Sequence, residues 1–171
     1  MRKSVKKLLA GLLVGAMALC ATAPAFAADG DKVDTTGTYK ASFYAYYDAD
    51  KDGTSEWAPA PMGMDTGCIT TGWTYDEEEG IIEMSFETFY MTYGTQQISG
   101  DITNITGAAV LSKTTTSKNN MTVLQSAEFD SDALTTVPGT NLEGIAANMS
   151  YSALYGAMTN NMDVYLVIEQ V

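Results

Sequence analysis

The sequence predicts an all-β fold, a single antiparallel β-sandwich of immunoglobulin-like type, with a closed lipocalin-like β-barrel as the alternative. Three observations support this prediction. Apolar and polar residues alternate with a period of two along several segments, as they do in strands with one buried face. Turn-forming residues separate these segments about every 8 to 15 residues, which is typical of sandwiches and small barrels. The chain has 171 residues and leaves 144 after an expected cleavage, a common size for one domain.

The first 27 residues have the features of a secretory signal peptide. Four basic residues precede an apolar run over residues 8–20, and the small residues Ala25 and Ala27 suit signal peptidase. We expect residues 28–37 to form a flexible leader and residues 38–171 to form the domain. No second long apolar run and no evident wall anchor follow the signal, so the sequence predicts a secreted protein, in the style of Gram-positive bacteria.

Charge and composition exclude several classes of function. Cleavage removes four of the nine bases and none of the 21 acids, so the mature net charge is −16. Such a charge disfavours nucleic acid and anionic lipid as partners. The chain has no histidine, which excludes a Ser-His-Asp triad and a His-ligated zinc site. Glu83 and Glu87 share a strand face and could be considered as the two carboxylates that a glycosidase needs. Exposure of alternate residues to solvent explains this pair better. We therefore predict that the protein is not an enzyme.

The first strands follow from the alternation. Residues 39–47 place Tyr39, Ala41, Phe43, Ala45 and Tyr47 on one face of a strand. The acidic residues 48–53 interrupt this strand, and two prolines predict a loop or 3₁₀ turn over residues 57–66. Residues 69–75 and 81–93 form the arms of a hairpin. The second arm changes phase near Thr88, which predicts a β-bulge or a strand that crosses from one sheet to the other.

The second half of the chain continues the pattern. Residues 97–106, 121–129 and 162–169 alternate as strands, whereas residues 113–120 are expected to be a polar loop and residues 130–144 to be rich in loops. Residues 141–158 are ambiguous between helix and strand. We favour a strand over residues 149–155, with a possible helical turn before it. In either geometry Tyr151 and Tyr155 are expected to point the same way.

An acidic segment is the candidate metal site. Residues 48–53 carry carboxylates at the first, third and fifth positions and glycine at the sixth, as at the opening of a calcium-binding loop. Glu56 adds a further carboxylate at the ninth position, but Pro59 takes the twelfth, so the segment is no EF-hand. An ordinary solvated turn is the alternative. The predicted calcium ligands are Asp48, Asp50, Asp52 and Glu56.

The sequence Tyr151-Ser-Ala-Leu-Tyr155 resembles the Tyr-x-x-x-Tyr motif of NEAT domains, the immunoglobulin-like haem-uptake modules of Gram-positive surface proteins. The resemblance implies that Tyr151 ligates ferric haem iron and that Tyr155 hydrogen-bonds to it. It also implies a short cap over the haem just after the first strand. Residues 57–64 lie there and offer the thioethers of Met62 and Met64, and both phenolate and thioether are known haem-iron ligands.

Two functions remain open from the sequence. The first is a secreted, non-enzymatic binding module for haem or another flat apolar ligand, held by Tyr151, Tyr155, Met62 and Met64. The second is a structural or adhesive module, stabilised by calcium, with no small-molecule ligand. Protein partners and oligomeric state cannot be predicted from the sequence.

Overall fold

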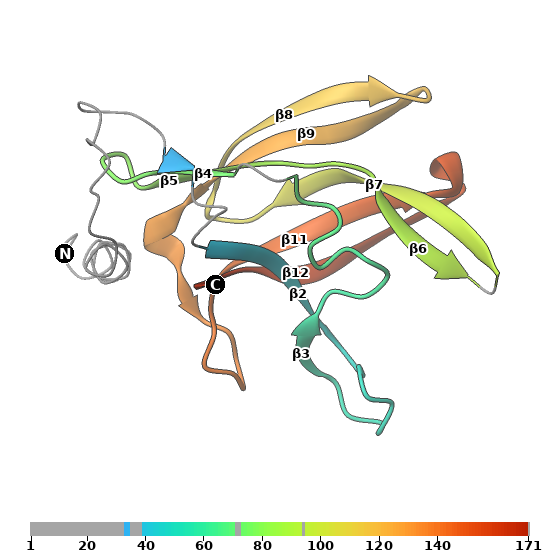
Figure 1. The fold of residues 1–171 in the computed structure, drawn as a ribbon, viewed down its shortest axis with the longest axis horizontal. Coiled ribbons are helices and arrows are strands. Elements are labelled where there is room, and N and C mark those ends of the chain that lie inside the picture. The colour runs from blue at the N-terminus through green and yellow to red at the C-terminus, as the bar shows by residue number, and fades with distance from the viewer. Residues whose placement is uncertain (1–32, 35–38, 71–72, 94, 171) are drawn as a thin grey trace, which may run out of the picture.

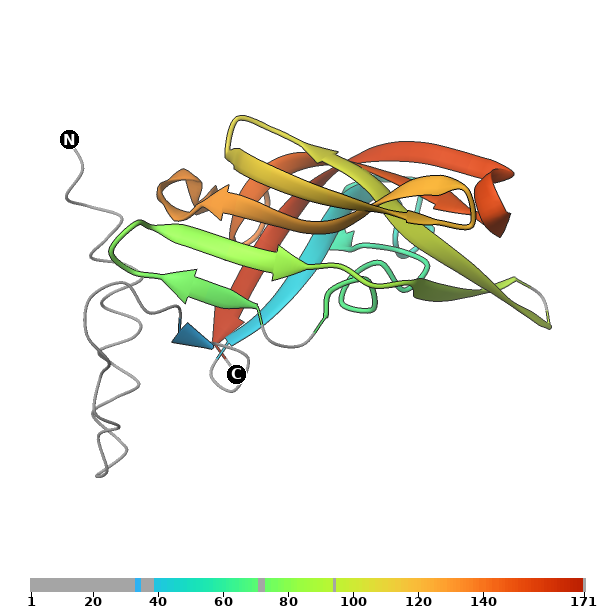
Figure 2. The same ribbon diagram turned by 90° about the horizontal axis from the view of Figure 1, so that it is seen from above.

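The computed structural model describes residues 33–34, 39–70, 73–93 and 95–170. The predicted signal peptide lies outside the described residues, as does the predicted leader apart from Val33–Asp34. Among the described residues, no helix has the length and apolar character needed to cross a bilayer. The fold is all-β, as predicted, and its two antiparallel sheets pack face to face, one of them curled (Figures 1 and 2).

The first sheet has the strand order β1-β4-β5-β9-β8. Its strands are β1 (Val33–Asp34), β4 (Thr74–Asp76), β5 (Ile81–Ser85), β8 (Val110–Lys118) and β9 (Met121–Asp130). β1 falls inside the predicted leader and pairs with β4.

The second sheet has the order β3-β2-β12-β11-β7-β6, and β10 pairs with β11. Its strands are β2 (Tyr39–Tyr47), β3 (Glu56–Pro59), β6 (Phe89–Tyr93), β7 (Gln96–Thr106), β10 (Thr135–Thr136), β11 (Glu143–Ala153) and β12 (Met158–Gln170). Two short 3₁₀ turns, η1 (Ser131–Ala133) and η2 (Leu154–Gly156), complete the described elements.

The core lies between the two sheets, as the alternation predicts. On β2 the side chains of Ala41, Phe43 and Ala45 are buried, and their partners on β12 are the apolar residues at every second position. Phe43 stacks on Phe86 with ring centroids 6.2 Å apart. Because Phe86 follows β5 of the first sheet, this ring pair joins the two layers across the core.

The phase change near Thr88 marks a crossing between sheets, the second of the two predicted alternatives. β5 pairs with β9 in the first sheet, whereas β6 pairs with β7 in the second. Residues 86–88 carry the chain across. The inward parity shifts by one residue there because the two strands present their buried side chains to the core from opposite layers.

Three local predictions were wrong. Residues 57–59, expected to be part of a loop or 3₁₀ turn, belong to the edge strand β3. On the outward face of this strand Trp57 packs between Tyr46 and Tyr165. Proline is tolerated at an edge. Residues 113–118, expected to be a loop, belong to edge strand β8, whose side chains are nearly all exposed. Residues 143–153 are strand throughout, so no helical turn precedes Met149.

Candidate functional site

The loop between β2 and β3 gathers carboxylates around its own backbone. Tyr47 pairs with Glu56 at the base of this hairpin. Within the loop, the backbone N–H of Gly53 donates to Asp48 Oδ2 at 3.1 Å, and that of Ala49 donates to Glu56 Oε1 at 2.8 Å. These bonds turn the side chains of Asp48 and Glu56 toward the middle of the loop.

Three of the four predicted calcium ligands come together here. Asp48, Asp50 and Glu56 each offer a carboxylate oxygen, and these oxygens lie within 4.8 Å of one another. Calcium binds oxygen at about 2.3–2.6 Å, so ligands on opposite sides of one ion lie about 4.8 Å apart. The spacing therefore fits a single calcium ion.

One oxygen in this group is unsatisfied. Asp48 Oδ1 is shielded from solvent and accepts no hydrogen bond. A shielded carboxylate oxygen without a partner is costly, and this one stands beside two further acidic side chains. A bound cation removes both costs at once, by supplying the missing partner and by neutralising the repulsion.

Asp52, the fourth predicted ligand, is not a member of the group. Its Oδ1 accepts a hydrogen bond from the backbone N–H of Thr54 at 2.7 Å, and its side chain is exposed. Asp52 shapes the far side of the turn, where Lys51 and Gly53 have left-handed φ angles. The alternation of acids along the loop did not distinguish this role from ligation.

The structure does not bring the four predicted haem-binding residues to one surface. Tyr151 is buried in β11 and packs edge-on against Phe89, with ring centroids 6.1 Å apart. Tyr155 is exposed on η2. Met64 is fully buried, whereas Met62 is exposed. Two side chains of the set thus belong to the core and two face solvent.

The two tyrosines diverge for a local reason. The expectation that they share a face assumed regular strand or helix geometry from residue 151 to 155. β11 instead ends at Ala153, and Leu154 and Tyr155 have left-handed φ angles of 52° and 53°. The left-handed turn breaks the regular repeat before it reaches the second tyrosine. Haem ligation by Tyr151 stays a prediction.

The segment that was expected to cap a haem packs against β2. The backbone N–H of Phe43 donates to Asp65 O at 2.7 Å, and that of Ala60 donates to Phe43 O at 2.8 Å.

The buried Cys68 thiol donates to Met64 O at 3.0 Å. Burial raises the pKa of this thiol to about 12, so Cys68 is poorly suited to act as a nucleophile or a metal ligand at neutral pH.

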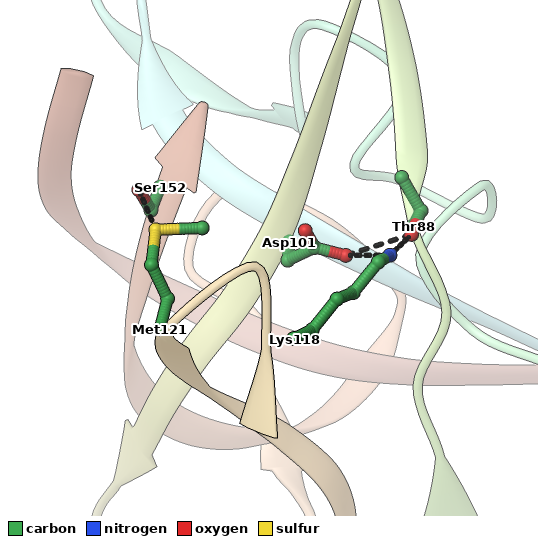
Figure 3. A network of polar contacts seen from close by, with 5 residues as sticks. All are labelled: Thr88, Asp101, Lys118, Met121 and Ser152. Carbon is green, nitrogen blue, oxygen red and sulfur yellow. Dashed lines mark hydrogen bonds and ion pairs between the residues drawn. The ribbon is translucent and has the colours of Figure 1, made fainter. Parts of the chain in front are cut away.

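A polar network that sequence reasoning missed joins the crossing segment to β7 and β8 (Figure 3). Asp101 Oδ1 accepts hydrogen bonds from Thr88 Oγ1 at 2.7 Å and from Lys118 Nζ at 2.8 Å, and Lys118 also donates to Thr88. These side chains line a half-open cavity of about 240 Å³. The three residues come from distant segments, so no local motif could have indicated them.

A second contact in the same region involves a thioether. Ser152 Oγ lies 3.7 Å from the Sδ of Met121, the first residue of β9, in the geometry of a weak hydrogen bond (Figure 3). This contact places the β8–β9 turn against the end of β11. The two hairpins thus support each other where they leave the body of the sandwich.

Comparisons with known proteins do not assign the chain to a family. No family model, no curated protein and no solved structure matches it. The case for a function therefore depends on the residues described above, among which the loop of Asp48, Asp50 and Glu56 has the clearest chemistry.

Proposed function

We propose that the protein is a secreted, non-enzymatic structural module of the β-sandwich class, whose β2–β3 loop binds one calcium ion through Asp48, Asp50 and Glu56. The observation that carries the proposal is the shielded, unpartnered Oδ1 of Asp48 within a group of three convergent carboxylates. Hard oxygen ligands of this kind suit calcium rather than a soft metal.

The position of the loop indicates what the ion does. Asp48 directly follows β2, and Glu56 is the first residue of β3. An ion held between them ties the edge strand β3 to its neighbour at the loop end of the hairpin. Because β3 is only four residues long, a further link at this end stabilises the edge of the sheet.

Affinity is expected to be low. Extracellular oxygen-ligand sites bind calcium with Kd on the order of 10⁻⁴–10⁻³ M, and this loop offers three protein carboxylates, with water expected to complete the shell. With about 2 mM calcium and a Kd near 10⁻⁴ M, linkage predicts a stabilisation of about 2 kcal/mol. Saturation therefore requires the calcium levels found outside cells.

The experiment is a thermal unfolding series with calcium, with magnesium and with chelator. We expect about 2 mM calcium to raise the Tm by several degrees, and magnesium to raise it less because magnesium demands stricter octahedral geometry. Asp50→Asn is expected to abolish the gain. Asp52→Asn is the matched control, since it removes the same charge from the same loop outside the group, and it is expected to keep the gain.

Two results would contradict the proposal. Identical unfolding curves with calcium and chelator would leave the loop as an ordinary acidic turn. Equal loss of the calcium effect in Asp50→Asn and Asp52→Asn would indicate diffuse screening of charge rather than ligation.

A further inference from the structure

One end of the domain carries almost no charge, although the chain is strongly acidic. Three pairs of strands, namely β6–β7, β8–β9 and β11–β12, extend toward this end, and both views show them pointing to the same side (Figures 1 and 2). No charged residue occurs in residues 88–100, 119–127 or 144–162. Asp101 and Lys118, which lie beside these segments, form an ion pair with each other, and the exposed Glu87 lines the same cavity. We call this region the uncharged end.

The uncharged end exposes large apolar side chains. On and beside η2, the exposed fractions are 75% for Tyr155, 50% for Met158 and 42% for Leu154, and on the neighbouring β6–β7 hairpin Tyr90 is 58% exposed. Single exposed apolar residues are ordinary, but several at one end without an intervening charge indicate an interaction surface.

The backbone at η2 gives a second, independent indication. Leu154 and Tyr155 both have left-handed φ angles, a conformation that costs about 1–2 kcal/mol for a residue with a Cβ. The adjacent β8–β9 turn needs the same conformation and uses Asn119 and Asn120, which tolerate it. Leu154 and Tyr155 instead carry large apolar side chains on this strained turn, and backbone strain of this kind is typical of functional sites.

Met121 of β9 packs against the strained turn and supports it. A Cβ on Gly156 would approach Met121 Sδ to 2.9 Å, so Met121 packs directly against the backbone of η2. Met121 in turn contacts Ser152. This packing presents the apolar side chains of Leu154 and Tyr155 on a supported turn instead of a free loop.

We infer that the uncharged end binds the uncharged end of a second copy of this chain. The distribution of charge selects this occupant. A net charge of −16 repels another copy over most of the surface, whereas contact through the uncharged end brings few charged side chains together. The acidic β4–β5 turn, with Asp76 through Glu79, lies at the opposite end of the molecule (Figures 1 and 2). End-to-end contact therefore separates these acids by far more than the screening length of about 8 Å.

The contact is expected to be isologous, so each copy contributes the same apolar side chains to a two-fold interface. Tyrosine at the centre of such a patch is typical of residues that dominate association energy. Added salt should strengthen this association, because it screens the remaining repulsion between acidic bodies without weakening an apolar contact. The inference does not depend on calcium binding.

The test is sedimentation equilibrium of the protein purified from an exporting host, in chelator, at low and high salt. We expect a monomer–dimer equilibrium that shifts toward dimer with salt. The double variant Leu154→Asn, Tyr155→Gly is expected to weaken dimerisation by about 100-fold or more. The same variant relieves backbone strain, so its Tm should be equal or higher, which separates lost contact from misfolding.

Two further arms sharpen the test. Leu111→Asn, which removes an exposed leucine from β8 away from the uncharged end, is the matched control and should leave dimerisation unchanged. Met158→Glu and Met158→Lys should each weaken self-association, and an equal mixture of the two should associate more tightly than either alone. Recovery in the mixture identifies a contact between two copies across the same residue.

Three results would overturn the inference. The wild-type protein could remain monomeric at all salt concentrations. Dimerisation could persist at full strength in the Leu154→Asn, Tyr155→Gly variant. A monomer that floats with phosphatidylcholine vesicles through Tyr155 would show that the uncharged end serves a lipid surface instead.

Discussion

Gly100 is the position where the packing of the sandwich can be tested most sharply. Gly100 lies in the middle strand β7, where it pairs with Phe89 of β6 on one side and with Ala153 of β11 on the other. A Cβ at this position would lie 2.4 Å from Phe89 Cζ and 2.7 Å from Cε2, where ordinary contact begins at 3.4 Å. The ring therefore occupies the space that any side chain at position 100 would need.

The ring has little room to retreat. Phe89 is fully buried, and Tyr151 packs against it edge-on. An alanine in a strand usually stabilises by about 0.5–1 kcal/mol relative to glycine, whereas overpacking a filled core costs about 1–3 kcal/mol. With an overlap of about 1 Å, the second effect dominates. Gly100→Ala should destabilise the fold by about 1–3 kcal/mol, or lower the Tm by about 4 °C per kcal/mol.

A double-mutant cycle isolates the cause. Phe89→Leu deletes Cε1, Cε2 and Cζ, the three atoms that crowd Gly100, and should by itself cost about 1–3 kcal/mol. In that background Gly100→Ala should be neutral or stabilising. The assay is urea unfolding followed by the fluorescence of Trp57 and Trp73. A cost for Gly100→Ala that is the same in both backgrounds, within about 0.5 kcal/mol, would refute the steric argument.

Three further predictions concern pH, the core tyrosine and the polar network. Burial raises the pKa of Cys68 to about 12 and also raises the pKa of Tyr75, so both groups hold their protons more tightly in the folded state. The free energy of unfolding should therefore be highest below about pH 9 and fall above it. A urea midpoint that rises from pH 8 to pH 10.5 would contradict this prediction. Tyr151→Phe keeps the buried ring, so the free energy of unfolding should change by less than about 1 kcal/mol. The absorbance spectrum after addition of hemin should be the same for this variant and the wild type. A Soret band that the wild type shows and this variant lacks would support the haem prediction instead. Asp101→Asn leaves Lys118 without its ion-pair partner. This change should lower the free energy of unfolding by about 1 kcal/mol at low salt and by less in added NaCl. An unchanged free energy of unfolding at low salt would show that the ion pair does not stabilise the fold.

The strands with one buried face could be predicted from the sequence, because burial on one side imposes a period of two on the residues. β2 and β12 show this pattern plainly, and the crossing near Thr88 was visible as a change of parity. β8 was missed because an edge strand with both faces exposed carries no such pattern, and its run of threonines looks like a loop. The short β3 was missed because Pro59 is compatible with an edge position that only the fold reveals.

The candidate sites were predictable to a smaller degree. The acids of the β2–β3 loop lie within nine residues, so local spacing was enough to indicate Asp48, Asp50 and Glu56. Spacing could not show that Asp52 faces away. The expectation for Tyr151 and Tyr155 failed at the first irregular backbone angle, and the Asp101 network joins segments that only the sheet topology brings together.

The crossing between β5 and β6 has a consequence for how the domain comes apart. Residues 86–88 are a strap of three residues between one sheet and the other, and the backbone N–H of Phe86 is bonded to Gln125 O at 2.8 Å while Thr88 is bonded to Asp101. Because these three residues are hydrogen-bonded to both sheets, one sheet cannot unfold without displacing the other. Amide hydrogens in β5 and β6 should therefore exchange in a single cooperative opening, and the two layers should share one melting transition although each has its own strand ladder.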